Sequence, residues 1–174
     1  MSVNLPNKLT LIRIALVPVC LILLALGWDI AAAALFAIAS VTDFVDGYLA
    51  RRDNLVTNFG KFADPIADKI LTMTMMILMA VKGYLPAWLP IIVAVRELAV
   101  DGLRLIAVEQ GKVVAAGMSG KIKTALQMTT IIYCCVFHNA LGLILSIAVA
   151  AITIYSGVAY FWQLRDLFTK DLKG

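Results

Sequence analysis

Six long apolar runs constrain the fold of this chain more than any other feature. They cover residues 10–27, 30–49, 62–81, 87–108, 122–137 and 141–162. About 20 apolar residues suffice for a helix to cross a bilayer, and in lipid only a helix satisfies its own backbone hydrogen bonds over such a run. Hydrophobic residues make up 62% of the chain and charged residues 15%, which excludes a soluble globular domain, a disordered tail and a disulfide scaffold. The sequence predicts an all-α integral membrane protein with six transmembrane helices in one bundle.

The connections between the runs are short and contain turn-forming residues, so we expect consecutive helices to be antiparallel neighbours. No linker, repeat or low-complexity segment divides the chain, which predicts a single membrane domain over residues 1–174. Residues 1–9 are expected to lie along the membrane interface as an N-terminal segment, with Pro6 as a stop.

Basic residues are concentrated on one side of the predicted membrane: Lys8, Arg13, Arg51, Arg52, Lys61, Lys112, Lys121, Lys123, Arg165, Lys170 and Lys173. Lys82 alone is expected on the other side. Loops rich in Lys and Arg remain in the cytoplasm. The protein is therefore expected to be multi-pass, with both termini cytoplasmic.

Four aspartates form the most informative cluster. Asp43 and Asp46 share one face of the second predicted helix, and Asp64 and Asp68 share one face of the third. Both pairs lie near the cytoplasmic ends of neighbouring helices, so the two faces can converge. Four carboxylates repel each other unless cations neutralise them, and an all-oxygen ligand set favours Mg²⁺ or Mn²⁺, here two ions. The alternative is that these acids pair with nearby bases, namely Arg51, Arg52, Lys61 and Lys69.

The full pattern is D-x-x-D-G-x-x-A-R, eight residues, then G-x-x-x-D-x-x-x-D. Its members are Asp43, Asp46, Gly47, Ala50, Arg51, Gly60, Asp64 and Asp68. The pattern resembles, at every position, the signature of the CDP-alcohol phosphotransferase family of integral membrane enzymes. The resemblance implies six transmembrane helices, an active site on the cytoplasmic side and a homodimer.

The resemblance also implies roles for individual residues. Asp43, Asp46, Asp64 and Asp68 would hold two divalent ions, and Asp68 would be the general base. The residues expected to bind the CDP group are Asp43, Gly47, Ala50, Arg51 and Gly60, with Asn7 and Thr57 as further candidates.

Further segments resemble one bacterial branch of the family, which transfers a phosphatidyl group from CDP-diacylglycerol to glycerol 3-phosphate in the cytoplasmic membrane. They are N-L-P-N-K-L-T at 4–10 with Arg13, R-E-L at 96–98, G-L-R at 102–104 and G-K-I-K-T at 120–124. A phosphate requires fixed cationic donors. The candidates for binding the acceptor phosphate are Arg104, Lys121, Lys123 and Arg13. The expected partners are the two substrates, membrane lipid and a second copy of the chain, and no nucleic acid.

Three alternatives stay open. The acceptor could be inositol phosphate, serine or phosphatidylglycerol. Acids inside a membrane can also line an ion path, which leaves a divalent-cation transporter as a different class of function. Arg96 and Glu97 lie deep in the fourth helix and are expected to point apart. Their role is either an ion-pair network, in which Glu97 and Asp101 find basic partners, or substrate binding.

Overall fold

The computed structural model describes residues 5–52, 58–111 and 117–171, with side chains described for 9–42, 60, 63–111 and 117–165. Its regular elements within those ranges are α1 (Leu5–Ala25), α2 (Asp29–Arg52), α3 (Asn58–Val81), α4 (Trp88–Glu109), α5 (Met118–Val136) and α6 (Ala140–Asp171). The all-α expectation is confirmed, and each helix covers all or nearly all of one of the six apolar runs.

Two helix starts differ from the expectation. Helix α1 begins at Leu5, so Pro6 lies in its first turn and does not stop it. Proline fits there because the first N–H groups of a helix have no partner within the helix. Residues 58–60, which precede the third apolar run and were therefore not expected in its helix, form the first turn of α3. Asparagine favours a helix start, which explains why the turn residue Asn58 begins the helix.

One segment in the described part of the chain is long and apolar enough to cross a membrane, at Ala140–Arg165 in α6. The apolar stretches Leu9–Ala25 and Asp29–Thr42 are shorter. Acidic and basic side chains interrupt α3 and α4, which lowers the hydropathy of any window along them. The six-span membrane bundle therefore stays a prediction.

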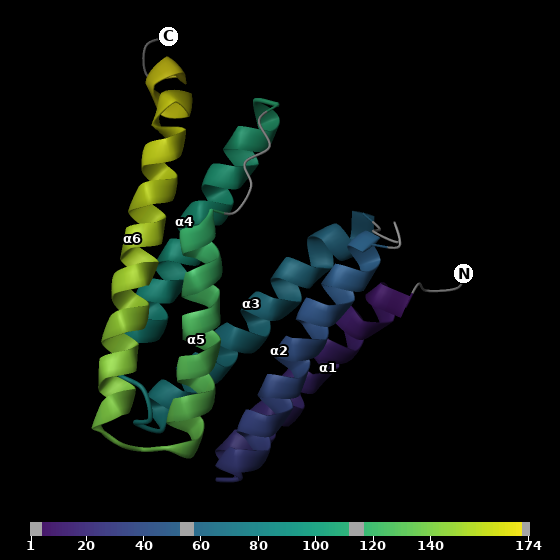
Figure 1. Cartoon of the computed structure of the whole chain (residues 1–174), viewed down its shortest axis with the longest axis vertical. Helices are drawn as coiled ribbons and strands as arrows, with labels where there is room; N and C mark the ends of the chain where they lie inside the picture. The colour runs from purple at the N-terminus through teal and green to yellow at the C-terminus, as the bar shows by residue number, and fades with distance from the viewer. Residues whose placement is uncertain (1–4, 53–57, 112–116, 172–174) are drawn as a thin grey trace.

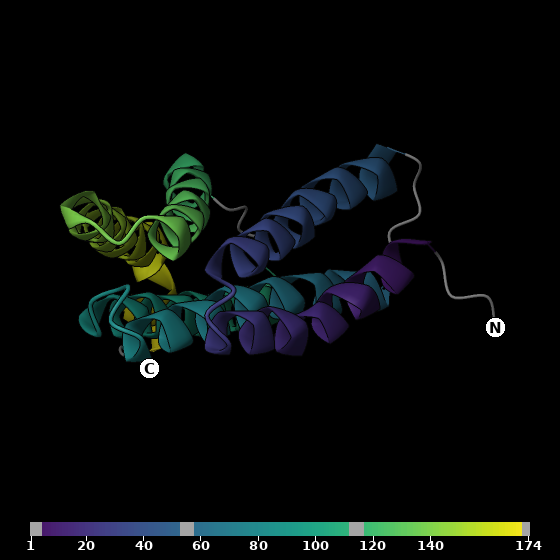
Figure 2. The same cartoon turned by 90° about the horizontal axis from the view of Figure 1, so that it is seen from below.

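The helices form two groups of three (Figures 1 and 2). Helix α1 packs against α2 and α3, and α6 packs against α4 and α5, while α2–α5 and α3–α4 contacts join the groups. The expectation that every consecutive pair packs together is wrong for α4 and α5, whose described backbones do not approach each other. A cavity with charged walls lies between these two helices, which accounts for the separation.

The helices alternate in direction along the chain. Helices α1, α3 and α5 begin, and α2, α4 and α6 end, toward the upper end of Figure 1. The two groups diverge toward that end and close together at the other. The cavity therefore lies where the bundle opens.

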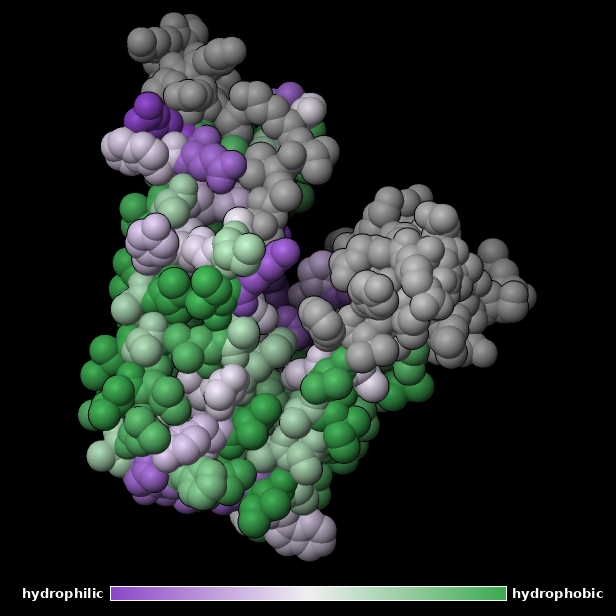
Figure 3. Space-filling view, viewed as in Figure 1, coloured by the Kyte–Doolittle hydropathy of each residue, from purple (hydrophilic) through white to green (hydrophobic). Residues whose placement is uncertain are grey.

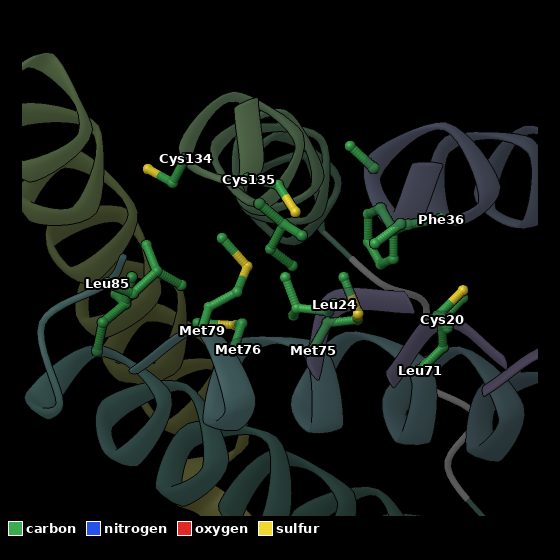
Figure 4. Packing of buried hydrophobic residues seen from close by; sticks show 14 of the residues in the cluster. Cys20, Leu24, Phe36, Leu71, Met75, Met76, Met79, Leu85, Cys134 and Cys135 are labelled. Carbon is green, nitrogen blue, oxygen red and sulfur yellow. The ribbon is translucent and has the colours of Figure 1, made fainter. Parts of the chain in front are cut away.

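Buried apolar residues join the groups at the closed end (Figure 4). The cluster includes Phe36 of α2, Met75, Met76 and Met79 of α3, and Cys135 of α5. These three methionines of α3 are therefore packing residues. The cysteines Cys20, Cys134 and Cys135 are buried free thiols that pack as small apolar side chains.

At the closed end, Asp29 at the start of α2 contacts residues of the α3–α4 turn and of the α5–α6 turn. Its carboxylate accepts a hydrogen bond from Tyr84 Oη (2.8 Å) and lies 3.3 Å from Lys82 Nζ. Burial alone lowers the pKa of Lys82, but the interactions with Tyr84 and Asp29 outweigh it and raise the pKa above its ordinary value. His138 Nε2 lies 3.9 Å from the same carboxylate. The lone base expected on this side of the membrane is therefore neutralised by an acid.

Candidate active site

A cavity of about 260 Å³ lies between α3, α4, α5 and α6. In Figure 3, hydrophilic side chains gather in the hollow between the two helix groups, while apolar side chains cover much of the lower part of the molecule. The charged residues that line the cavity are Asp68, Lys69, Arg96, Glu97, Asp101, Arg104 and Lys123. Cations and carboxylates from three helices thus meet in one enclosed space.

Glu97 is at the centre of the charges in this cavity. Its Oε1 accepts hydrogen bonds from Lys123 Nζ (2.5 Å) and from Arg96 Nη1 (3.0 Å). Its Oε2 lies 3.4 Å from Lys69 Nζ, and Lys69 also pairs with Asp101. The expectation that Glu97 and Asp101 find basic partners is confirmed.

The expectation that Arg96 and Glu97 point apart is wrong. Neighbouring positions on a helix do diverge, but the arginine stem is long enough to turn its guanidinium toward the next side chain. The polar cavity favours this conformation because a guanidinium turned the other way would lie among apolar side chains. Lys69, considered as a partner for the aspartates, instead bridges to α4.

The cavity brings together two of the four acceptor-phosphate candidates. Arg104 lines it and donates from Nε to Tyr160 Oη of α6 (3.2 Å). Lys123 lines it with only 4% of its surface exposed. Lys121 is exposed and lies outside the lining residues. Arg13 is buried in α1 and is also outside them.

Asp64 and Asp68 lie one turn apart on α3, as the spacing predicts, and they have different surroundings. Asp68 lines the cavity. Asp64 accepts a hydrogen bond from Thr10 of α1. Helices α1 and α3 run in the same direction, so Arg13, one turn beyond Thr10, is level with Asp68.

For most of the candidate CDP-binding residues, the structure describes the backbone but not the side chain. Helix α2 contains Asp43, Gly47, Ala50 and Arg51, and helix α1 contains Asn7, but the structure describes only the backbone at these positions. The same holds for the metal-ligand candidate Asp46 on α2. Thr57 lies outside the described residues, and Gly60 is buried in the first turn of α3.

The donors that are described suit a hard cation. Asp64 and Asp68 offer carboxylate oxygens on one helix face, the ligand type that Mg²⁺ and Mn²⁺ prefer. Among the described side chains, no three acidic, histidine or cysteine groups are close enough to hold a metal by themselves. Asp43 and Asp46, expected as the other two ligands, lie on the neighbouring helix α2.

The sequence interpretation missed several residues of the cavity wall. Tyr160 lies in an apolar helix and shows no signal of its own in the sequence. Lys69 and Asp101 were expected to form ion pairs, because charge inside an apolar run is costly and needs a partner, but their spacing did not place them in one cavity. Ser119 and Ser156 also line the cavity and are ordinary small polar residues in sequence.

Comparisons with known proteins identify the family of this chain. Residues 3–160 match the family model of CDP-alcohol phosphatidyltransferase. The chain is 48% identical over 143 residues to the CDP-diacylglycerol–glycerol-3-phosphate 3-phosphatidyltransferase of Bacillus subtilis, covering 74% of each chain.

Two further relatives match almost the whole chain. The enzyme of that name from Rickettsia typhi is 36% identical, covering 95% of this chain and 99% of its own. A probable phosphatidylglycerophosphate synthase of Mycobacterium tuberculosis (strain H37Rv) is 38% identical, covering 94% of this chain and 83% of its own. With the family model matching most of its length, this chain belongs to the CDP-alcohol phosphatidyltransferase family.

Proposed function

We propose that the protein is a phosphatidylglycerophosphate synthase, an enzyme that transfers the phosphatidyl group of CDP-diacylglycerol to sn-glycerol 3-phosphate and releases CMP. The names of the curated relatives support this activity. The observation that carries the choice of acceptor is the convergence of Arg104 and Lys123 on the cavity that Asp68 lines. A phosphorylated acceptor needs such cations, whereas serine does not.

Asp43, Asp46, Asp64 and Asp68 would hold two divalent ions, Mg²⁺ or Mn²⁺. When bound, such ions neutralise the diphosphate and stabilise the negative charge that develops on it. Gly47, Ala50, Arg51 and Gly60, with Asn7 and Thr57, would contact the CDP group. Gly47 and Gly60 would let the nucleotide approach the helix backbone closely.

Asp68 would act as the general base. The acceptor hydroxyl oxygen forms the new bond to the phosphatidyl phosphorus, and the bond from that phosphorus to CMP breaks. The hydroxyl proton goes to the Asp68 carboxylate. Arg104 and Lys123 would fix the acceptor phosphate in the same cavity, so that its hydroxyl is close to Asp68.

We also propose that the chain forms one domain over residues 1–174 that crosses a bacterial cytoplasmic membrane six times, with both termini cytoplasmic. The alternating helix directions support this topology, since both ends of the chain belong to one side. The eleven basic residues that the sequence assigns to the cytoplasmic side are expected there too, while Lys82 is expected on the other side. A homodimer is part of the proposal on the strength of family membership alone.

The function is tested by CMP release from CDP-diacylglycerol with purified protein in lipid nanodiscs. Glycerol 3-phosphate, inositol phosphate, serine and phosphatidylglycerol are supplied as separate acceptors. We expect glycerol 3-phosphate to exceed each of the others by at least about 100-fold in kcat/KM, the range that a dedicated polar site achieves. Faster CMP release with any of the other three would contradict the proposed acceptor.

Arg104→Ala should raise the KM for glycerol 3-phosphate by roughly 10- to 100-fold, because a charge-assisted hydrogen bond contributes about 1.5–3 kcal/mol. The KM for the lipid donor should change little. Lys121→Ala is the matched control, since it removes an exposed charge near the same end of the bundle without altering the cavity wall. Equal effects of Arg104→Ala on both KM values would indicate a structural role for Arg104.

A further inference from the structure

Two of the cations in the cavity share a single carboxylate oxygen. Lys123 reaches Glu97 Oε1 from α5, and Arg96 reaches the same atom from the adjacent position on α4. Because both contact one atom, the ammonium and the guanidinium are neighbours at a fixed place in the cavity. Glu97 thus determines where two positive charges of the wall lie.

The stem of Arg96 lies against two glycines from other helices. A Cβ atom added at Gly157 of α6 would lie 3.1 Å from Arg96 Cγ. A Cβ atom at Gly120 of α5 would lie 3.9 Å from Arg96 Nη2. The stem of Arg96 therefore lies beside α6 at Gly157, and its guanidinium lies beside α5 at Gly120 and against Glu97.

Lys123 and Arg96 both keep N–H donors that do not bond to Glu97. A lysine ammonium has three donors and an arginine guanidinium has five. One hydrogen bond from each goes to Oε1, which leaves further N–H groups for an anion in the cavity. Both residues line that cavity, and without the carboxylate two neighbouring cations would repel each other and move apart.

We infer that Glu97 is a positioning residue for the acceptor, holding Lys123 and Arg96 as a preformed pair of cations that receives the phosphate of glycerol 3-phosphate. This inference rests on the proposed function. A preformed pair lowers the entropy cost of binding, because two long side chains are ordered before the acceptor arrives. Arg96 thereby joins Arg104 and Lys123 as a donor to the acceptor phosphate.

Glu97→Gln tests the inference, and Asp101→Asn is the matched control. Asp101 lies one turn further along α4 and pairs with Lys69, and its side chain is 41% exposed against 15% for Glu97. We expect Glu97→Gln to raise the KM for glycerol 3-phosphate about 10-fold or more, with the KM for CDP-diacylglycerol within about threefold of wild type. Asp101→Asn should leave both KM values within about threefold.

A double-variant cycle separates positioning from general destabilisation. If Glu97 acts through Lys123, then Glu97→Gln should add much less to the acceptor KM in a Lys123→Met background than in the wild type. Effects that multiply in full would overturn the inference. So would a Glu97→Gln enzyme whose two KM values rise equally.

Gly157→Ala provides a test that leaves every charge in place. The added methyl group pushes on the Arg96 stem, so the acceptor KM should rise by about threefold or more without a matching change for the lipid donor. An unchanged acceptor KM in this variant would overturn the role of Arg96, even if Glu97→Gln cannot be recovered folded. The proposed function is tested separately, by the turnover of the wild type with each acceptor. The effect of Glu97 is the ratio of the variant KM to the wild-type KM, and this ratio can be measured with any phosphorylated acceptor that the enzyme uses.

Discussion

Asp68→Asn should reduce turnover by about 10²- to 10⁴-fold, the range that general-base catalysis contributes. The amide cannot accept the proton of the acceptor hydroxyl, but it keeps the size of the side chain and one oxygen donor. Binding of CDP in the presence of Mn²⁺ should stay close to wild type, because the retained oxygen can still act as a ligand and Asp43, Asp46 and Asp64 keep their charges. The measurement is single-turnover CMP release beside calorimetric titration of CDP.

Asp101→Asn serves as the control for this variant, since it makes the same chemical change in the wall of the same cavity. Near-normal turnover of Asp68→Asn would show that another group takes the proton. Loss of CDP binding in that variant would show that the Asp68 charge is needed to hold the metal, and it would contradict the prediction that the base role accounts for the loss of turnover.

The second large effect is expected from the other aspartates. Asp43→Asn or Asp64→Asn should remove metal-dependent CDP binding and, with it, activity, because each replaces an anionic ligand with a neutral amide. Titration with Mn²⁺, followed by electron paramagnetic resonance, should show fewer bound ions per chain. An unaltered titration in both variants would contradict the two-ion site.

Thr10→Val is a useful control for Asp64. It removes the hydrogen bond that Thr10 donates to this carboxylate but keeps the carboxylate itself. The loss of one hydrogen bond should weaken Mn²⁺-dependent CDP binding by no more than about 10-fold. A complete loss of binding in Thr10→Val would mean that the orientation of Asp64 matters as much as its charge.

The fold could be predicted from the sequence in part. The apolar runs predicted the helices, because apolar length and turn residues are local features. The packing of α1 against α3 and the separation of α4 from α5 could not be predicted. Which helix faces meet depends on side chains far apart in the chain, and short connections do not determine it.

The candidate site shows the same division. Helical spacing was sufficient to place Asp64 and Asp68 on one face of α3. Local rules failed at Arg96, where a neighbouring carboxylate and a polar cavity turned the guanidinium toward Glu97. Local rules also could not tell which of Lys121 and Lys123 lines the cavity, since both belong to one basic segment. Helix packing buries Lys123 and leaves Lys121 exposed.

The sequence by itself determined the helices, the aspartate pattern and the family, because each follows from residue type and from spacing along one chain segment. Only the tertiary structure decided which charges share a cavity. Arg104, Lys123, Glu97 and Tyr160 come from three helices, and their convergence depends on how α4, α5 and α6 pack. Burial then makes those contacts strong, because charges removed from water must find partners within the protein.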